Sequence, residues 1–287
     1  MFDPSRTASS LQDMEGGPLR ATVDLARRWR GSSIEQTFVL HSGSRRLDVE
    51  TWIEWRQRNI LLRALFPLNV RSHEATFETM YGAQRRPTHR NTSFEAARFE
   101  VSAHRWADIS EPGYGAALLN DGKYGHSVRD NVLGISLLRG PLYPDPRADE
   151  GHHHFTYSLF PHPGDWTEAG VVEEAFALNS PLVALPAGTG SGTLPVEWSF
   201  VRAEGVKLAL GSLKMAEDGR GVILRLYEPH GARGRCTLRF GSRVEKASRV
   251  NLLEEPEGEA PEVEGSEVRF QVRPFEVLTL RLELENG

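Results

Sequence analysis

Apolar and polar residues alternate along most of the chain, with a period of two. Leu19, Val23 and Leu25, for example, fall at alternating positions of one such run. This alternation predicts β-strands with one face buried and the other in water. Glycine, proline, asparagine and aspartate separate the runs at short intervals, so the chain has the pattern of an all-β protein. The clearest further runs are 34–40, 47–55, 221–228, 236–240, 268–272 and 277–284.

One stretch departs from this period and favours a helix. Within residues 168–178, Val171, Ala175 and Leu178 recur at helical spacing, although the same residues also fit a strand. Farther along, the segment from Pro186 to Pro195 has the glycine-rich composition of a linker. We therefore expect two β domains, a larger one of residues 1–190 and a smaller one of residues 191–287.

Composition narrows the class of protein. A formal net charge of −5 and the absence of a long basic stretch argue against nucleic-acid binding. The one cysteine, Cys236, excludes an internal disulfide framework and favours a reducing compartment. The first ten residues do not form a signal peptide, and no run approaches the roughly 18 apolar residues of a membrane span. These features predict a cytoplasmic protein with no membrane partner.

Three adjacent histidines, His152 to His154, raise the question of a metal site. If they lie on a strand, their side chains point alternately to opposite faces, so the three cannot bind one ion together. His152 and His154 would form at most a pair that needs a third ligand from elsewhere. We therefore expect a structural or surface role and no metal in this chain.

Other catalytic motifs are incomplete. The stretch SHEATFE begins like the zinc-binding H-E-x-x-H, but Phe77 stands where the second histidine is required. The glycine-rich residues 188–193 match no nucleotide-binding loop, and no G-x-S-x-G nucleophile motif is present. Cys236 lies inside a strand pattern, which predicts a buried and unreactive thiol.

Two turn-rich stretches, LLNDGKYGHSVRDN and LLRGPLYPDPRADEG, concentrate polar and aromatic residues. Loops of this composition often border binding sites, and sugars require carboxylates for their hydroxyls and aromatic rings for their C–H faces. The alternative is that these residues only form turns through local hydrogen bonds. Our candidates for residues at the rim of a sugar site, called the rim residues below, are Tyr124, His126, Arg139, Asp145, Arg147 and Asp149.

Several motifs occur together in a fixed order. They are RPTHRNTS at 86–93, AHRW at 103–106, GYGAALLNDGKYG at 113–125, PDPRADEGHHHFTY at 144–157 and PHPGDW at 161–166. In this order they resemble the C-terminal β region of α-mannosidases of glycoside hydrolase family 38, of the bacterial and vacuolar type. The resemblance begins near Gly17 and covers nearly all of the remaining chain. One departure is Gly122, where many relatives carry cysteine.

The resemblance implies a fold, and it implies that the catalytic groups belong to a different domain. The fold would be a galactose-mutarotase-like supersandwich followed by a smaller β-sandwich. In the family, an N-terminal α/β barrel carries an Asp nucleophile, an acid/base carboxylate and a zinc or similar divalent ion, and this chain has no βα alternation that would form such a barrel. We therefore expect a fragment without catalytic residues or a cofactor of its own. Its expected partners are its own catalytic domain, α-mannoside glycans and, on the same resemblance, further copies of itself.

Two alternatives stay open at this point. A stand-alone mutarotase or epimerase would need a histidine acid and a carboxylate base, and His126 or His153 with a nearby aspartate would have to serve. An independent carbohydrate-binding module would bind mannose oligosaccharides without catalysis. The fold alone does not choose between these functions.

Overall fold

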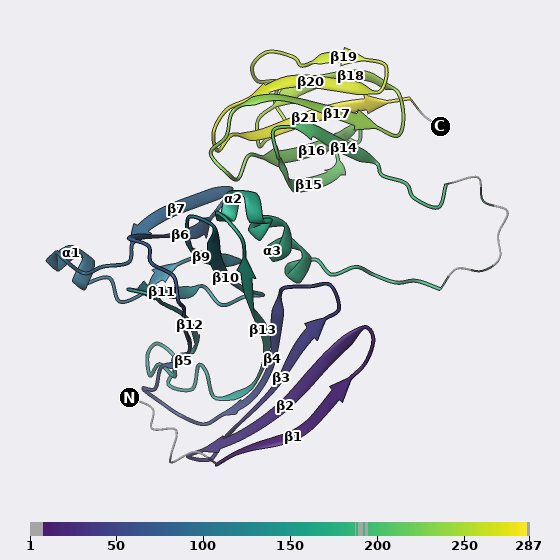
Figure 1. Ribbon diagram of the computed structural model, residues 1–287. Coiled ribbons are helices and arrows are strands. Elements are labelled where there is room, and N and C mark those ends of the chain that lie inside the picture. The colour runs from purple at the N-terminus through teal and green to yellow at the C-terminus, as the bar shows by residue number, and fades with distance from the viewer. Residues whose placement is uncertain (1–7, 187, 189–191, 193–194, 286–287) are drawn as a thin grey trace. The chain divides into compact units, whose positions relative to one another are not determined.

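The computed structural model describes residues 8–186, 188, 192 and 195–285 (Figure 1). The chain divides into two compact units, one formed by Met1–Thr79 with Gln84–Pro181 and the other by Met80–Ala83 with Leu182–Gly287. The predicted boundary between residues 190 and 191 lies outside the described residues. Most of the predicted linker between Pro186 and Pro195 lies outside them as well.

The first unit is built on a nine-stranded sheet in which every recorded pairing is antiparallel. Its order is β1 (Ala8–Gly16), β2 (Arg20–Trp29), β3 (Ser32–His41), β4 (Leu47–Trp55), β13 (Gly151–His162), β10 (Tyr114–Asn120), β9 (Trp106–Glu111), β6 (Glu74–Thr79) and β7 (Gly82–Pro87). The pairing of β13 with β4 joins segments about a hundred residues apart and places His153 opposite Ile53. This pairing brings the conspicuous histidine strand into the middle of the sheet.

A second, four-stranded sheet lies against the first. Its order is β5 (Leu62–Pro67), β12 (Val132–Leu138), β11 (Gly125–Arg129) and β8 (Val101–Ser102). The hydrophobic core lies between the two sheets, because the cluster of buried apolar residues draws on both: Ile53, Trp55 and Leu118 come from the larger sheet, and Leu133 and Ile135 from the smaller. Burial alternates along β4 as the sequence predicts, with Ile53 buried and Trp52 exposed, whereas β9 and β10 are buried on both faces.

Three helices are described in the first unit. α1 (Ser93–Ala96) is a single turn, whereas α2 (Trp166–Ala169) and α3 (Val171–Asn179) pack on β9 and β10 (Figure 1). The helix predicted over 168–178 is therefore present, but it is broken at Gly170. Gly170 has a φ of 82°, in the left-handed region, which ends α2 and starts α3 in a new direction. Val171, Val172 and Ala175 are buried by this arrangement.

The second unit is a smaller β-sandwich of two four-stranded sheets. One sheet has the order β14 (Val201–Gly205), β17 (Gly234–Phe240), β20 (Glu267–Val272) and β19 (Glu262–Glu264). The other has the order β15 (Ala209–Met215), β16 (Val222–Tyr227), β21 (Val277–Leu284) and β18 (Val244–Val250). Leu224, Leu238 and Leu280 fill the core between them, and the free Cys236 is buried there. The predicted all-β class and the buried thiol are both confirmed.

Candidate functional site

The first predicted loop is held by the buried side chain of Asn120, at the end of β10. Its amide oxygen accepts hydrogen bonds from the backbone N–H groups of Gly122 (3.0 Å) and Lys123 (2.6 Å), and its amide nitrogen donates to the backbone oxygen of His104 (2.9 Å). These bonds fix a tight turn. The turn presents Tyr124, which is 60% exposed and meets the ring of His104 edge to face at 6.0 Å.

The second predicted loop, residues 139–150, is closed by Asp149. One oxygen of its carboxylate accepts from the backbone N–H groups of Arg139 (2.8 Å) and Gly140 (2.7 Å), which joins the two ends of the loop. Within the loop, the Asp145 carboxylate accepts from the backbone N–H of Arg147 at 2.8 Å. The side chain of Arg147 is exposed, as is that of Asp145. Asp149 thus shapes the loop, and Asp145 and Arg147 present charge to solvent.

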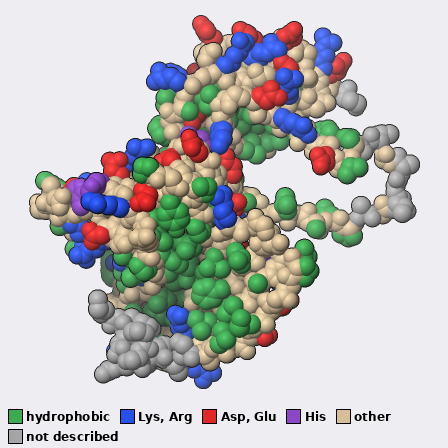
Figure 2. Space-filling model, viewed as in Figure 1, with side chains coloured by type: hydrophobic (Ala, Val, Ile, Leu, Met, Phe, Trp, Pro, Cys, Tyr) green, Lys and Arg blue, Asp and Glu red, His purple; other side chains and the backbone are tan. Residues whose placement is uncertain are grey.

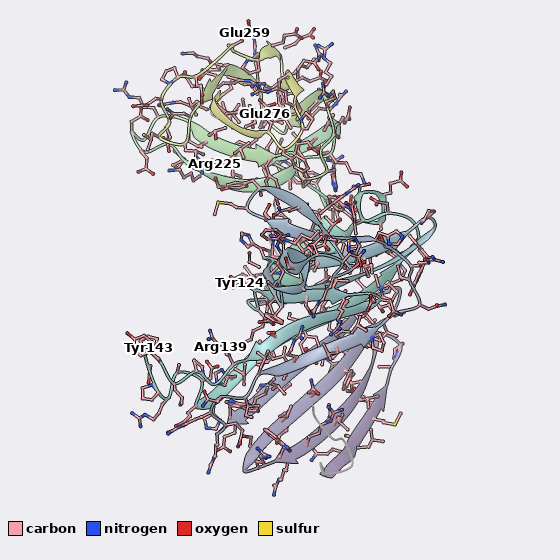
Figure 3. The ribbon with its side chains drawn as sticks, turned by 90° about the vertical axis from the view of Figure 1, so that its left-hand side faces the viewer. Tyr124, Arg139, Tyr143, Arg225, Glu259 and Glu276 are labelled. Atoms are coloured by element: carbon pink, nitrogen blue, oxygen red, sulfur yellow. The ribbon has the colours of Figure 1, made fainter. Side chains whose placement is uncertain are left out.

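Lys123 connects the two loops electrostatically. Its ammonium group lies 4.2 Å from the centre of the Phe155 ring. Burial lowers its pKa, while the negative charges of Asp149 and Asp121 oppose that shift. Each predicted loop therefore places a carboxylate near one half-buried cation, and Figure 3 shows Tyr124 and Arg139 on the same side of the first unit. Lys123 was not among the predicted rim residues, although it stands in the same NDGKYG turn.

His126 occupies a different environment from the other rim residues. It is the second residue of β11, and its side chain is fully buried. Burial lowers its pKa to about 4, so the ring is neutral at physiological pH. A side chain sealed in this way packs the smaller sheet and meets no solvent. The other five rim residues reach the surface in whole or in part.

The three adjacent histidines lie on β13 and alternate in direction. His152 and His154 are exposed on the outer face of the sheet, where the His154 ring stacks on Trp52 at 4.7 Å. His153 points to the other face and forms a 2.8 Å hydrogen bond with the backbone oxygen of Asp149. Within the described ranges, no three His, Cys, Asp or Glu side chains are grouped so as to hold a metal ion.

A buried polar cluster was missed by sequence reasoning. The Nε2 atom of His162 on β13 lies 2.7 Å from the carboxylate of Asp108 on β9, and the Ser110 hydroxyl donates to the same carboxylate at 2.5 Å. Burial raises the pKa of Asp108, opposed by its hydrogen bonds from His162 and Ser110. The cluster is sealed from solvent, with both partners of the ion pair at most 1% exposed. It is therefore a structural link between strands.

The geometry does not supply the acid and base of a mutarotase at the predicted positions. His153 contacts the backbone oxygen of Asp149 and not a carboxylate. Nε2 of His126 lies 3.5 Å from the amide nitrogen of Asn120, so its neighbour is also not a carboxylate. The histidine that does meet an aspartate, His162, is enclosed in the fold. None of these arrangements offers a histidine and a carboxylate to a sugar at the surface.

Two protein-family models match the chain. The glycosyl hydrolases family 38 C-terminal domain matches residues 3–147, and the glycosyl hydrolases family 38 C-terminal β-sandwich domain matches residues 207–280. The chain belongs to the C-terminal region of glycosyl hydrolase family 38. The first matched segment falls in the first unit except for Met80–Ala83, and the second matched segment falls in the second unit.

Curated members of the family extend the match over nearly the whole chain. Human alpha-mannosidase 2C1 is 41% identical over 275 residues, which cover 94% of this chain but 26% of the human protein. Alpha-mannosidase G of Dictyostelium discoideum is 36% identical, with 93% of this chain and 25% of that protein covered. The family 38 region described here thus spans about a quarter of the length of these relatives.

Solved structures of the family share the fold. An α-mannosidase from Enterococcus faecalis superimposes with a TM-score of 0.82 at 18% identity, over 97% of this chain and 35% of that one. A second family 38 protein from the same species gives a TM-score of 0.80 at 17% identity. In the described part of this chain, no helix has both the length and the apolar character needed to cross a membrane.

Proposed function

We propose that this chain is the non-catalytic β portion of a retaining α-mannosidase, which supports the catalytic domain and contributes to the rim of its substrate pocket. The proposal rests first on the family and on length, because the related α-mannosidases are about four times as long. The two catalytic carboxylates, and the zinc or other divalent ion, would belong to the portion that this chain does not contain.

The observation that carries the proposal is a pair of exposed apolar side chains on β1, the edge strand of the larger sheet, which lie beside partly buried apolar residues of β2. Leu11 lies opposite Leu25, and Met14 lies opposite Val23, so these side chains share one face. A β-bulge between Leu11 and Asp13 keeps Leu11 and Met14 on that face despite their odd spacing. Leu11 is 60% exposed and Met14 is 66% exposed.

The same face continues across the neighbouring strands. Val23 lies opposite Phe38 of β3, which is partly buried against the hydrophobic core, whereas Leu40 at the end of β3 is exposed. Figure 2 displays hydrophobic side chains gathered over this part of the first unit. A contiguous apolar patch on an otherwise charged protein is typical of a surface that another protein part covers. The partner that we propose for this face is the rest of an α-mannosidase, which makes up about three-quarters of the length of the relatives.

The exposed rim residues fit the second half of the proposal. Tyr124 offers an aromatic face, and Asp145 and Arg147 offer charged hydrogen-bonding groups on a loop fixed by Asp149. Pyranosides are recognised by this combination of ring faces and charged hydrogen-bonding groups. Arg139 and Asp149 would complete the rim, and His126 would act only through packing.

A chimera tests the proposal. The chain replaces the matching C-terminal quarter of human alpha-mannosidase 2C1, and hydrolysis of an aryl α-mannoside is measured. We expect activity in the chimera. Replacing both Leu11 and Met14 by Asp should reduce the yield of active chimera at least tenfold. The control Ser10→Asp, on the opposite face of β1, should leave the yield unchanged.

The rim is tested in the same chimera. Arg147→Ala should raise KM several-fold or lower kcat, without changing the amount of folded protein. Full yield from the Leu11 and Met14 double variant would contradict the docking face, and unchanged kinetics in Arg147→Ala would remove that residue from the rim.

A further inference from the structure

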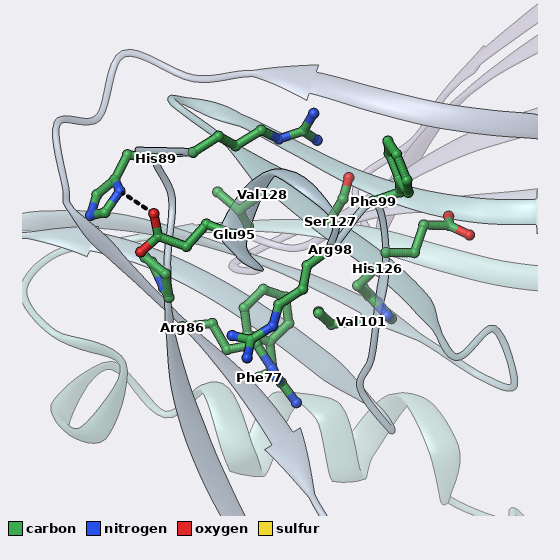
Figure 4. A pocket seen from close by; sticks show the side chains of 13 residues that line it. Phe77, Arg86, His89, Glu95, Arg98, Phe99, Val101, His126, Ser127 and Val128 are labelled. Atoms are coloured by element: carbon green, nitrogen blue, oxygen red, sulfur yellow. Dashed lines mark ion pairs between the residues drawn. The ribbon is translucent and has the colours of Figure 1, made fainter. Parts of the chain in front are cut away.

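A small pocket opens in the first unit between β6, β11 and the segment that carries α1. Phe77 forms its floor, and Arg86, Arg98 and His89 line its walls (Figure 4). Its cavity volume is about 30 Å³, which gives room for a small group. This site is separate from the rim residues, apart from the buried His126, which also contributes to the lining.

The segment around α1 is rigidly organised. The Thr92 hydroxyl accepts from the backbone N–H of Glu95 (3.2 Å), and the Glu95 carboxylate accepts from the backbone N–H of Thr92 (2.9 Å). These two bonds form a capping box. The same carboxylate lies 3.3 Å from Nδ1 of His89. The negative charge of Glu95 is thereby committed to Thr92 and His89.

The other carboxylate of the lining, Glu100, lies near Arg63 and accepts from the Ser136 hydroxyl, so Arg86 and Arg98 lack such a partner. Arg86 is half-buried, and its Nη2 donates to the neutral amide of Gln84 at 2.9 Å. Its Nε is buried without a hydrogen bond. Burial, and then the nearby charge of Arg98, lower the pKa of the Arg86 guanidinium. No carboxylate of the described residues forms an ion pair with Arg86 or Arg98.

Figure 4 shows the two guanidinium groups lying together over the Phe77 ring, and the carbon of the Arg86 guanidinium is 5.9 Å from the ring centre. The charge of the exposed Arg98 repels that of the half-buried Arg86, and the Nε–H of Arg86 that lacks a partner is costly at its buried position. An oxyanion between the two groups would remove both costs, because guanidinium groups bind carboxylates and phosphates through paired N–H···O bonds.

We propose that this pocket binds an oxyanion, a phosphate or carboxylate group, held between Arg86 and Arg98. The pocket is small and open, so the remainder of a larger ligand would extend into solvent past Phe99, an exposed residue of the lining. The His89–Glu95 pair lies at the opposite side of the pocket and positions the segment without neutralising the arginines (Figure 4).

The test is calorimetric titration of the 287-residue chain with inorganic phosphate and, in a second arm, with acetate. We expect saturable binding of at least one anion with one site per chain. Tighter binding of phosphate would assign the site to phosphorylated ligands, and tighter binding of acetate would assign it to carboxylates. Arg86→Gln and Arg98→Gln should each weaken that binding at least tenfold, whereas Arg28→Gln, on the exposed surface of β2, should not change it.

A charge-reversal variant keeps the test independent of folding. Arg98→Glu places a carboxylate beside Arg86, so it should raise the melting temperature and abolish anion binding together. Each variant is first checked for the native circular dichroism spectrum. Absence of saturable binding to both anions, or unchanged affinity in Arg86→Gln and Arg98→Gln, would overturn the proposal.

Discussion

The buried histidine of β11 makes the stability of the first unit depend on pH. The pKa of His126 is lowered from 6.5 to about 4 in the folded protein by burial. Between these two values the unfolded chain therefore binds more protons than the folded chain, and stability rises with pH. The contribution is fully present above pH 6.5 and is lost as the pH falls towards 4. Each pH unit contributes about 1.4 kcal/mol, so the total loss is about 3 kcal/mol.

Urea unfolding between pH 4 and 7.5 measures this contribution. Tryptophan fluorescence reports mainly the first unit, because Trp198 is the one tryptophan of the second unit among the six in the chain. The comparison is between the wild type and His126→Gln, which cannot titrate. Other groups titrate in both proteins, so the difference in the slope of unfolding free energy against pH isolates His126. A uniform destabilisation of the variant does not affect that difference.

The matched control is His152→Gln, at an exposed position on β13. It should retain the wild-type slope. If His126→Gln keeps the same slope as the wild type, the ring is not buried in neutral form and the reasoning is refuted. In that case His126 would return as an accessible rim residue.

Three further predictions concern buried groups. Asp108→Ala leaves His162 without its buried partner, so it should lower the free energy of unfolding by about 3–5 kcal/mol. Urea titrations measure this loss. A loss below about 1 kcal/mol would mean that the pair is not formed. Gly115→Ala would place a methyl group 2.5 Å from Cε1 of His162, so it should lower the free energy of unfolding by about 1–3 kcal/mol. Unchanged stability would show that the packing around Gly115 is looser than described. Burial raises the pKa of the Cys236 thiol to about 11. A thiol reagent at pH 8 should therefore react with Cys236 only after denaturation. Rapid labelling of the native protein would contradict the burial of this thiol.

The strands were predictable because their signal is local. Alternation within residues 47–55 identifies both β4 and its faces, with Ile53 buried and Trp52 exposed. The same parity argument places His152 and His154 outside and His153 on the other face. These predictions need only the period of a strand, which is fixed by backbone geometry.

The polar contacts were not predictable, because they join residues far apart in the sequence. Asp108 and His162 are separated by 54 positions and meet only when β9, β10 and β13 align in register. The prediction of the rim residues was limited in the same way, because burial depends on the fold. His126 was grouped with the loop because it stands in the turn-rich stretch LLNDGKYGHSVRDN, but β11 begins at Gly125 and the His126 side chain is buried.

The role of Lys123 between the two predicted loops was also not predictable, because it depends on tertiary structure. Lys123 stands in the predicted stretch, but its partners lie elsewhere in the sequence. Its ammonium group lies over the ring of Phe155 on β13, and the charge of Asp149 in the second loop affects its pKa. The pocket at Arg86 and Arg98 arises in the same way, since the turn around α1 brings together two arginines twelve positions apart. Residue type indicated where charge gathers, and the fold determined which charges remain without partners.

The central claim is that this chain is a supporting portion of an α-mannosidase without catalytic groups of its own. The most direct test is hydrolysis of an aryl α-mannoside by the purified 287-residue chain, with and without added zinc or cobalt. The account predicts no turnover above the uncatalysed rate under either condition. Turnover that depends on the metal would contradict it, and would return the histidines of β13 as candidate ligands.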